Sequence, residues 1–283
     1  MTKIKSFELI LGNECNNNCR FCSNKKLNFK SPSFSEIKNI LLKNKSMNTL
    51  YLVGGEPTLR KDLIHIIIFA RKIGIKNINI QTNARMLSVE SYLDRLISLK
   101  VNIGISIHAH KADIHDLITG SNQSFFQVLS AIKILNKRKY PFTTNTVICS
   151  FNQNYIKEIV IFLKEINSSS ILLTLMSPIG ILNEELGKLL PDINILKNKT
   201  KEISDESVKF LDFPLCITNK DHISFESEKK VYIGKQTLLC IKNKTNNEKT
   251  KYSFCNTCKL SSQCQGLWTS YKISEQEFYN IIK

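Results

Sequence analysis

Three cysteines, Cys15, Cys19 and Cys22, fall within the segment 13–22, NECNNNCRFC. Thiolates on one loop can bind three irons of a cubane 4Fe–4S cluster and leave the fourth iron open to a ligand that is not protein. A closed zinc site needs four ligands, and no fourth ligand lies next to this loop. The spacing therefore favours an open iron–sulfur cluster, with a zinc site or purely structural cysteines as the alternatives.

Most of the remaining cysteines lie near the end of the chain. This second group consists of Cys216, Cys240, Cys255, Cys258 and Cys264. The chain has nine cysteines and no secretory signal, so they are better read as reduced metal ligands than as disulfides. Cys149 stands alone at the end of an apolar run, where we expect a small buried side chain.

The composition is that of a basic protein without a membrane segment. Forty Lys and Arg face 24 Asp and Glu, which gives a net charge of +16. The basic residues are spread along the chain, as on a solvated surface, although the charge also suits an acidic peptide or nucleic acid. No apolar run is long enough to cross a bilayer and no signal peptide is present, so we expect a cytoplasmic protein with no membrane partner.

Strand and helix patterns alternate over the first two thirds of the chain. Strands are predicted at 7–11, 50–53, 78–81, 101–107, 143–149 and 171–176, and helices at 35–45, 61–73, 88–99, 124–137 and 153–166. Short, nearly continuous apolar strands separated by helices predict a parallel sheet covered by helices. Six such units predict an open, partial (β/α)6 barrel of TIM type, whose functional loops follow the carboxyl ends of the strands.

The rest of the chain has a different pattern. Residues 181–210 are helical in pattern and rich in Lys and Glu, as in a connector. The segments HISFES and KKVYIG, at 222–227 and 229–234, alternate as in a β-hairpin, and a cysteine-rich tail follows. We therefore expect three parts: a barrel at 1–180, a helical connector at 181–212 and a small domain at 213–283.

The N-terminal motifs together resemble those of radical S-adenosylmethionine (radical SAM) enzymes. Phe21 lies directly before the last cysteine of the Cys-x3-Cys-x2-Cys loop, GGEP (54–57) follows the second strand, QTNA (81–84) follows the third, and GISIHAH (104–110) leaves the fourth. The resemblance implies a 4Fe–4S cluster whose open iron binds S-adenosylmethionine. One electron, from a flavodoxin- or ferredoxin-type donor, then releases a 5′-deoxyadenosyl radical that abstracts hydrogen from the substrate.

The resemblance also assigns roles to residues at the strand ends. Glu56 would accept from the methionine ammonium group, and Phe21 would pack beside the nucleoside. Met176 would back the adenine. The other implied cofactor contacts are Gly54, Gly55, Pro57, Thr82, Ser106 and Asn145, with ordinary filling of the barrel interior as the alternative for those outside GGEP.

The five histidines carry weaker predictions. His108 is two positions after Ser106, on the same face of the strand, and is either a substrate contact or a hydrogen-bonded interior histidine. His110 and His115 are expected in a loop after the fourth strand, where they could line the cavity. His65 and His222 are expected to be structural or exposed.

The tail, CNTCKLSSQCQG (255–266), resembles the SPASM domain and its shorter twitch form, which bind auxiliary clusters in peptide- and small-molecule-modifying radical enzymes. The SPASM pattern continues with a further cysteine at the position of Trp268, and no cysteine follows Cys264. The resemblance therefore implies one auxiliary 4Fe–4S cluster held by four of the five C-terminal cysteines. A zinc knuckle is the alternative.

The implied function is maturation of a ribosomally made peptide by crosslink, thioether or epimer formation. Because the first strand begins by residue 7, we expect a separate leader-peptide recognition protein or a basic surface that grips an acidic leader. The alternatives are oxidoreductase or tailoring chemistry on a small molecule, modification of nucleic acid, and a non-catalytic iron–sulfur carrier. The last alternative predicts no cleavage of S-adenosylmethionine.

Overall fold

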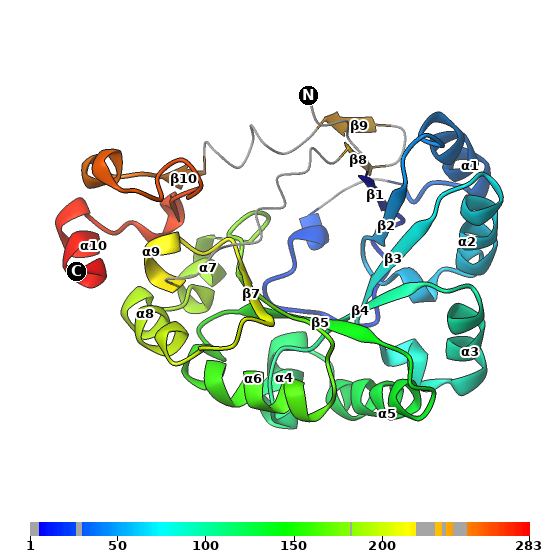
Figure 1. Cartoon of the computed structure of the whole chain (residues 1–283), viewed down its shortest axis with the longest axis horizontal. Helices are drawn as coiled ribbons and strands as arrows, with labels where there is room; N and C mark the ends of the chain where they lie inside the picture. The colour runs from blue at the N-terminus through cyan, green and yellow to red at the C-terminus, as the bar shows by residue number, and fades with distance from the viewer. Residues whose placement is uncertain (1–5, 27–29, 182, 219–229, 234–235, 240–247) are drawn as a thin grey trace.

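A computed structural model of the chain describes residues 6–26, 30–181, 183–218, 230–233, 236–239 and 248–283. Its centre is one curled sheet with the strand order β7-β6-β5-β4-β3-β2-β1-β8-β9. The first seven strands are parallel neighbours in sequence order, and helices cover the outer face of the curl (Figure 1). The predicted α/β partial barrel is confirmed.

The barrel strands are β1 (Ser6–Ile10), β2 (Thr49–Val53), β3 (Asn77–Thr82), β4 (Asn102–Ser106), β5 (Phe142–Ile148), β6 (Ile171–Leu175) and β7 (Val208–Leu211). Successive side chains of a strand point to opposite faces of the sheet. One set, such as Leu9, Leu52 and Ile80, is fully or almost fully buried against the helices. The other set is partly exposed and largely polar, and it lines the concave face, which we call the lumen.

The helices that cover the barrel are α1 (Phe34–Lys43), α2 (Leu63–Lys72), α3 (Glu90–Ser98), α4 (Ala112–Thr119), α5 (Ser124–Lys137) and α6 (Ile156–Glu165), and α7 (Asn183–Leu189) and α8 (Ile193–Lys201) follow β6. A capping box starts α1, because Ser33 and Glu36 each accept a backbone hydrogen bond from the other residue. Within the described residues, no helix is long and apolar enough to span a membrane.

Two predictions about the middle of the chain were wrong. The segment 181–210 is not helical throughout, because Val208–Leu211 forms β7 and pairs in parallel with β6. The sheet therefore continues beyond the six predicted strands. Helix α4 was not predicted, and His115 lies on it rather than in a loop.

The hairpin consists of β8 (Lys230–Ile233) and β9 (Gln236–Leu239), whereas HISFES lies outside the described residues. Strand β8 pairs in parallel with β1, so the hairpin extends the barrel sheet. The expected division at residues 180 and 212 stays a prediction, although β7 and the hairpin both belong to the barrel sheet.

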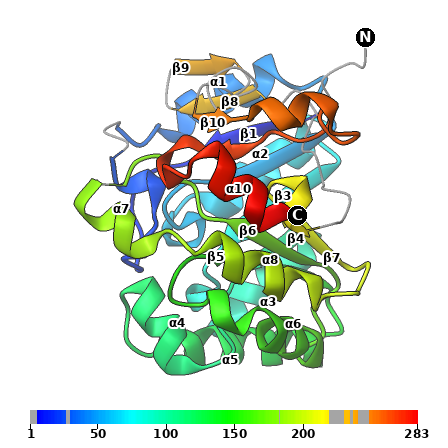
Figure 2. The ribbon, with the colours of Figure 1, turned by 90° about the vertical axis from the view of Figure 1, so that its left-hand side faces the viewer.

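The C-terminal part contains α9 (Leu215–Thr218), the short strands β10 (Lys249–Thr250) and β11 (Leu267–Trp268), and α10 (Glu275–Ile282). Figure 2 shows α10 beside α8, and the Lys197 ammonium donates to the carbonyl oxygen of Ile281. The buried Lys249 ammonium pairs with Asp212 at 2.8 Å and lies 4.3 Å from the ring centroid of Trp268. These contacts fasten the tail to the segment that follows β7, and Trp268 is a core residue there.

Candidate active site

The loop that carries Cys15, Cys19 and Cys22 follows β1 and is held by the end of α4. The backbone N–H of Asn18 donates to the carbonyl of Thr119 at 2.8 Å, and that of Arg20 donates to Ile118 at 3.0 Å. Gly120, with φ of 60°, packs so closely that a Cβ atom would lie 2.6 Å from the Asn18 carbonyl oxygen. The glycine therefore permits the close contact between α4 and the cysteine loop.

The GGEP loop packs directly on the base of the cysteine loop. The N–H of Gly55 donates to Gly12 and the N–H of Glu56 donates to Glu14, both at 2.7 Å. Gly54 has φ of 132°, and a Cβ atom there would lie 2.6 Å from the carbonyl oxygen of Gly12. The implied cofactor contacts of Gly54 and Gly55 stay predictions, and in this structure the two glycines permit the close approach of one loop to the other.

Glu56 is 4% exposed and lies at the centre of this junction. One carboxylate oxygen, Oε1, accepts from the Thr58 N–H at 3.0 Å, the Thr58 hydroxyl at 2.5 Å and the Thr82 hydroxyl at 2.6 Å. The other oxygen accepts from the backbone N–H of Asn83 at 2.7 Å. Burial raises the pKa of Glu56, and these hydrogen bonds oppose the rise. The predicted contact with a methionine ammonium stays a prediction.

The residues predicted on β3, β4 and β5 divide between the two faces of the sheet. Ser106 and Asn145 are register partners on the lumen face. Thr82 is 1% exposed and gives its hydroxyl to Glu56. The neighbour of Ser106 in the lumen is Gln81, whose amide donates to the Ser106 hydroxyl at 2.9 Å. Gln81 was missed, although the alternation of β3 makes it face the lumen.

Asn83 and Arg85 were also missed, and both contact the cysteine loop. The side-chain amide of Asn83 donates to Oδ1 of Asn16 at 2.7 Å and to the sulfur of Cys15 at 3.9 Å. The Arg85 guanidinium donates to Oδ1 of Asn17 at 2.9 Å and to the carbonyl of Asn16. The only available signal was that QTNAR leaves β3 at the edge of the sheet where functional loops gather.

The three N-terminal thiols lie close enough to interact electrostatically. Burial raises the pKa of Cys15, and it raises that of Cys19 to about 12, with Cys15 and Cys22 adding to the effect on Cys19. Among the described side chains, no three His, Cys, Asp or Glu converge as the ligands of a single metal ion. A cubane cluster differs from a single ion because each thiolate binds a different iron. Three thiols on one loop therefore fit a cluster whose fourth iron has no protein ligand.

Phe21 and Met176 meet in a small apolar cluster at the carboxyl ends of the strands. The cluster also contains Ile118, the fully buried Cys149 and Leu189. Phe21 packs edge-to-face on the ring of His108, with 4.9 Å between the centroids. Cys149 is the small buried side chain that we expected. The roles of Phe21 and Met176 toward a nucleoside stay predictions.

His108 is an interior, hydrogen-bonded histidine. Its Nδ1 accepts from the backbone N–H of Val147 at 3.3 Å, and the backbone N–H of His108 donates to Nδ1 of His115 at 3.1 Å. The two rings stack at 5.8 Å. Burial lowers the pKa of His108 to about 3 and that of His115 to about 4, so both are neutral near pH 7.

The remaining histidines add little to the site. His110 contacts the ring of Tyr155, with 5.4 Å between the centroids, and Nδ1 of His110 is buried without a partner among the described residues. His65 is exposed, as expected, and its ring lies beside Phe34. His222 lies outside the described residues.

The four described C-terminal cysteines come from two segments of the chain, and their thiols lie close enough to interact electrostatically. Burial raises the pKa of Cys216 on α9 to about 12, with added effects from Cys264, Cys255 and Cys258. The sulfur of Cys264 accepts from the backbone N–H of Leu215 at 3.5 Å, which ties the tail to α9. The binding of an auxiliary cluster by these four cysteines stays a prediction, and Cys240 lies outside the described residues.

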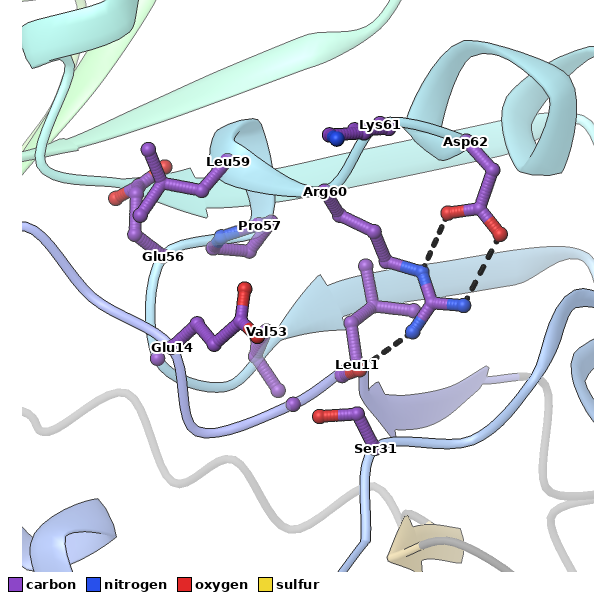
Figure 3. A pocket seen from close by; sticks show the side chains of 12 residues that line it. Leu11, Glu14, Ser31, Val53, Glu56, Pro57, Leu59, Arg60, Lys61 and Asp62 are labelled. Carbon is purple, nitrogen blue, oxygen red and sulfur yellow. Dashed lines mark hydrogen bonds and ion pairs between the residues drawn. The ribbon is translucent and has the colours of Figure 1, made fainter.

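A pocket of about 340 Å³ opens between the cysteine loop and the GGEP loop (Figure 3). Arg60 forms one wall, where it pairs with Asp62 at 2.6 Å and donates to the carbonyl of Leu11 at 2.8 Å. Pro57 is buried and begins the short 3-10 turn Pro57–Leu59. Arg60 thereby fixes the exit of β1 relative to the GGEP turn.

In a comparison with protein families, the model described as the radical SAM superfamily matches residues 9–163. An uncharacterized protein of Methanocaldococcus jannaschii is 30% identical over 209 aligned residues, in a match that covers 69% of this chain and 71% of that protein. A probable GTP 3′,8-cyclase of Saccharolobus islandicus is 28% identical over 192 residues. This second match covers 66% of this chain and 60% of the relative, less than two thirds of its length.

Solved structures share the fold at low identity. Streptococcus suis SuiB matches with a TM-score of 0.69 and 18% identity over 96% of this chain and 74% of SuiB. Native anSMEcpe with bound AdoMet, which is S-adenosylmethionine, matches with a TM-score of 0.66 and 17% identity over 98% of this chain and 96% of anSMEcpe. Both proteins are also known with a bound peptide, the precursor SuiA for SuiB and Cp18Cys for anSMEcpe.

Proposed function

The chain belongs to the radical SAM superfamily, and we propose that it modifies a ribosomally made peptide with the help of one auxiliary iron–sulfur cluster. Membership of the superfamily implies S-adenosylmethionine and a 4Fe–4S cluster as cofactors. The observation that carries the finer proposal is the electrostatic interaction of Cys216 with Cys255, Cys258 and Cys264, which lie behind a radical SAM barrel.

The residues at the carboxyl ends of β1 to β6 fit the two cofactors. When bound, these groups supply one-electron cleavage of the sulfonium bond and the 5′-deoxyadenosyl radical that abstracts hydrogen. Cys15, Cys19 and Cys22 would hold the cluster. The GGEP turn would hold the methionine end of S-adenosylmethionine, with Glu56 nearest its ammonium group.

The rest of the cofactor pocket would be formed by side chains of the lumen and the apolar cluster. Ser106 and Asn145 would contact the methionine or ribose, and Thr82 would act by holding Glu56. Phe21 and Met176 would flank the nucleoside and exclude water from it, since they already pack together with Cys149.

The four C-terminal thiols suit an auxiliary 4Fe–4S cluster, because a cubane with four protein ligands has no open iron and can relay an electron. Cys240 would then be the spare fifth cysteine. Four cysteines are also the ligand set of a structural zinc ion, although the described side chains do not converge on a single ion, so metal analysis decides between the two. When bound, such a cluster would supply one-electron relay from the substrate to an external acceptor such as an oxidised flavodoxin or ferredoxin.

The concave face supports a polar substrate such as a peptide. Asn79, Gln81 and Asn145 place side-chain amides on it, and the Thr174 hydroxyl donates to Asn145 at 2.8 Å. Amides can donate to and accept from peptide groups. The excess of 40 basic over 24 acidic residues suits an acidic leader, alone or with a separate recognition protein.

A second candidate is chemistry on a nucleotide, favoured by the probable GTP 3′,8-cyclases among the relatives. One experiment separates the candidates. The anaerobically reconstituted, reduced protein is incubated with S-adenosylmethionine and either a precursor peptide encoded beside its gene or GTP. A mass change in the peptide supports the proposal, whereas turnover of GTP with an unchanged peptide overturns it.

A further inference from the structure

The three N-terminal thiols differ in the hydrogen bonds that reach them. The sulfur of Cys15 accepts from the backbone N–H of Asn17 at 3.4 Å and from the side-chain amide of Asn83 at 3.9 Å. The first donor belongs to the cysteine loop itself. The second comes from the end of β3, 68 positions away in the chain. This contact therefore depends on the folded sheet, which brings the end of β3 next to the cysteine loop.

The orientation of the Asn83 amide is fixed by its neighbours. Its Oδ1 accepts from the backbone N–H of Arg85 at 3.1 Å, which leaves the NH2 group for Asn16 and Cys15. Its backbone N–H donates to Glu56 at 2.7 Å. With 8% exposure, Asn83 is a buried link between the GGEP turn and the cysteine loop.

An N–H donor stabilises negative charge on a sulfur. Reduction of a cluster adds an electron and makes the ligand sulfurs more negative, so hydrogen bonds to them raise the reduction potential. The Asn83 amide, 3.9 Å from the sulfur of Cys15, is such a donor. The same dipole acts on Cys15 as a cluster ligand.

We propose that Asn83 is a positioning residue that holds Cys15 in place as an iron ligand and raises the reduction potential of the cluster through its N–H···S contact. This inference rests on the proposed cluster at Cys15, Cys19 and Cys22, but not on any particular substrate. It also links the two halves of the site, because the backbone N–H of the same residue holds Glu56.

The test is a redox titration followed by electron paramagnetic resonance, on the full-length protein reconstituted with iron and sulfide. Asn83→Asp replaces the donor by a carboxylate of the same shape, and Asn83→Leu removes it without adding charge. Asn77→Asp is the matched control, because Asn77 begins the same strand and is exposed about 20 Å away.

We expect the ratio of reduced to oxidised cluster at a fixed potential to fall about tenfold in Asn83→Asp, which is about 59 mV for one electron. A smaller fall, about threefold, is expected in Asn83→Leu, and no change in Asn77→Asp. Folded Asn83 variants that carry the cluster at the parental potential would overturn the proposal.

Three further outcomes are also decisive. An Asn83 variant whose apoprotein melts like the parent but takes up no N-terminal cluster supports the positioning role. An apoprotein that is unfolded in both Asn83 variants makes Asn83 a structural residue and overturns the proposal. A parent protein that binds no cluster at all would instead refute the proposed function.

Discussion

The hydroxyl of Thr82, at the end of β3, donates a hydrogen bond of 2.6 Å to the carboxylate of Glu56 in the GGEP turn. The same hydroxyl accepts from the N–H of Ala84 at 3.0 Å. A buried carboxylate is costly unless donors surround it, and Thr82 is one of the donors that make Glu56 tolerable at 4% exposure.

Thr82→Val should destabilise the protein by about 1–2 kcal/mol, because it removes a donor from a buried charge and keeps the shape of the side chain. Thr143→Val is the control, since Thr143 is exposed on β5. Its effect should stay within about 0.5 kcal/mol. Urea unfolding measures both. Equal effects in the two variants would show that the bond to Glu56 adds nothing.

Glu56→Gln should weaken S-adenosylmethionine binding at least tenfold while the iron content stays parental. All four groups that contact the Glu56 carboxylate are donors. The NH2 group of the glutamine side chain would therefore face at least one N–H or O–H, and this repulsion would displace the GGEP turn. Equilibrium dialysis of the reconstituted protein measures the binding. Parental affinity would contradict the role carried over to Glu56.

The folding stability should fall as the pH is lowered from about 6.5 toward 4, because His108 and His115 are both buried in the neutral form. The pKa of His115 drops from the ordinary 6.5 to about 4 on folding, so the unfolded chain binds a proton that the folded protein does not bind. The contribution of His115 to the free energy of unfolding is fully present above about pH 6.5. Roughly 3 kcal/mol of it is lost by pH 4.

His115→Asn should therefore give a shallower loss of unfolding free energy over that pH range, because Asn cannot titrate yet can accept from the His108 N–H. His65→Asn is the control, because His65 is exposed. Chemical denaturation at several pH values provides the measurement. A parental slope in His115→Asn would mean that this histidine is not buried in its neutral form.

The sequence predicted the parts of the site that are continuous along the chain. The cysteine loop and the GGEP turn are short motifs, and each follows a strand whose apolar pattern marks it. The contacts between motifs were not predictable in the same way. Asn83 and Arg85 are ordinary polar residues in the sequence. Their role in the site depends on contacts with Asn16 and Asn17, which form only in the folded protein.

Short elements explain the errors in the fold. Strand β7 has four residues, of which Lys209 is polar, so neither its length nor its pattern separates it from the helices before it. Helix α4 has eight residues and lies where we expected the loop with His110 and His115. Tertiary pairing with β6 and packing on α5 stabilise these elements, and neither interaction is visible locally.

Cys258→Ala should remove the auxiliary cluster, leave the first one and abolish peptide turnover while S-adenosylmethionine is still cleaved. The parent should contain about eight irons and no zinc, and the variant about four, because a cubane holds four irons. Metal analysis gives the counts. Zinc with only four irons in the parent would make the tail a structural knuckle and remove its redox role.

The most direct test of radical SAM chemistry in this chain is the yield of 5′-deoxyadenosine from S-adenosylmethionine under anaerobic reduction. The parent should form it, and Cys19→Ala should not, because a loop with two thiols cannot hold the open cluster. Cys149→Ala should behave like the parent, since Cys149 is buried in the apolar cluster beyond the loop. Full cleavage by the Cys19→Ala variant would contradict the assignment of the cluster to Cys15, Cys19 and Cys22.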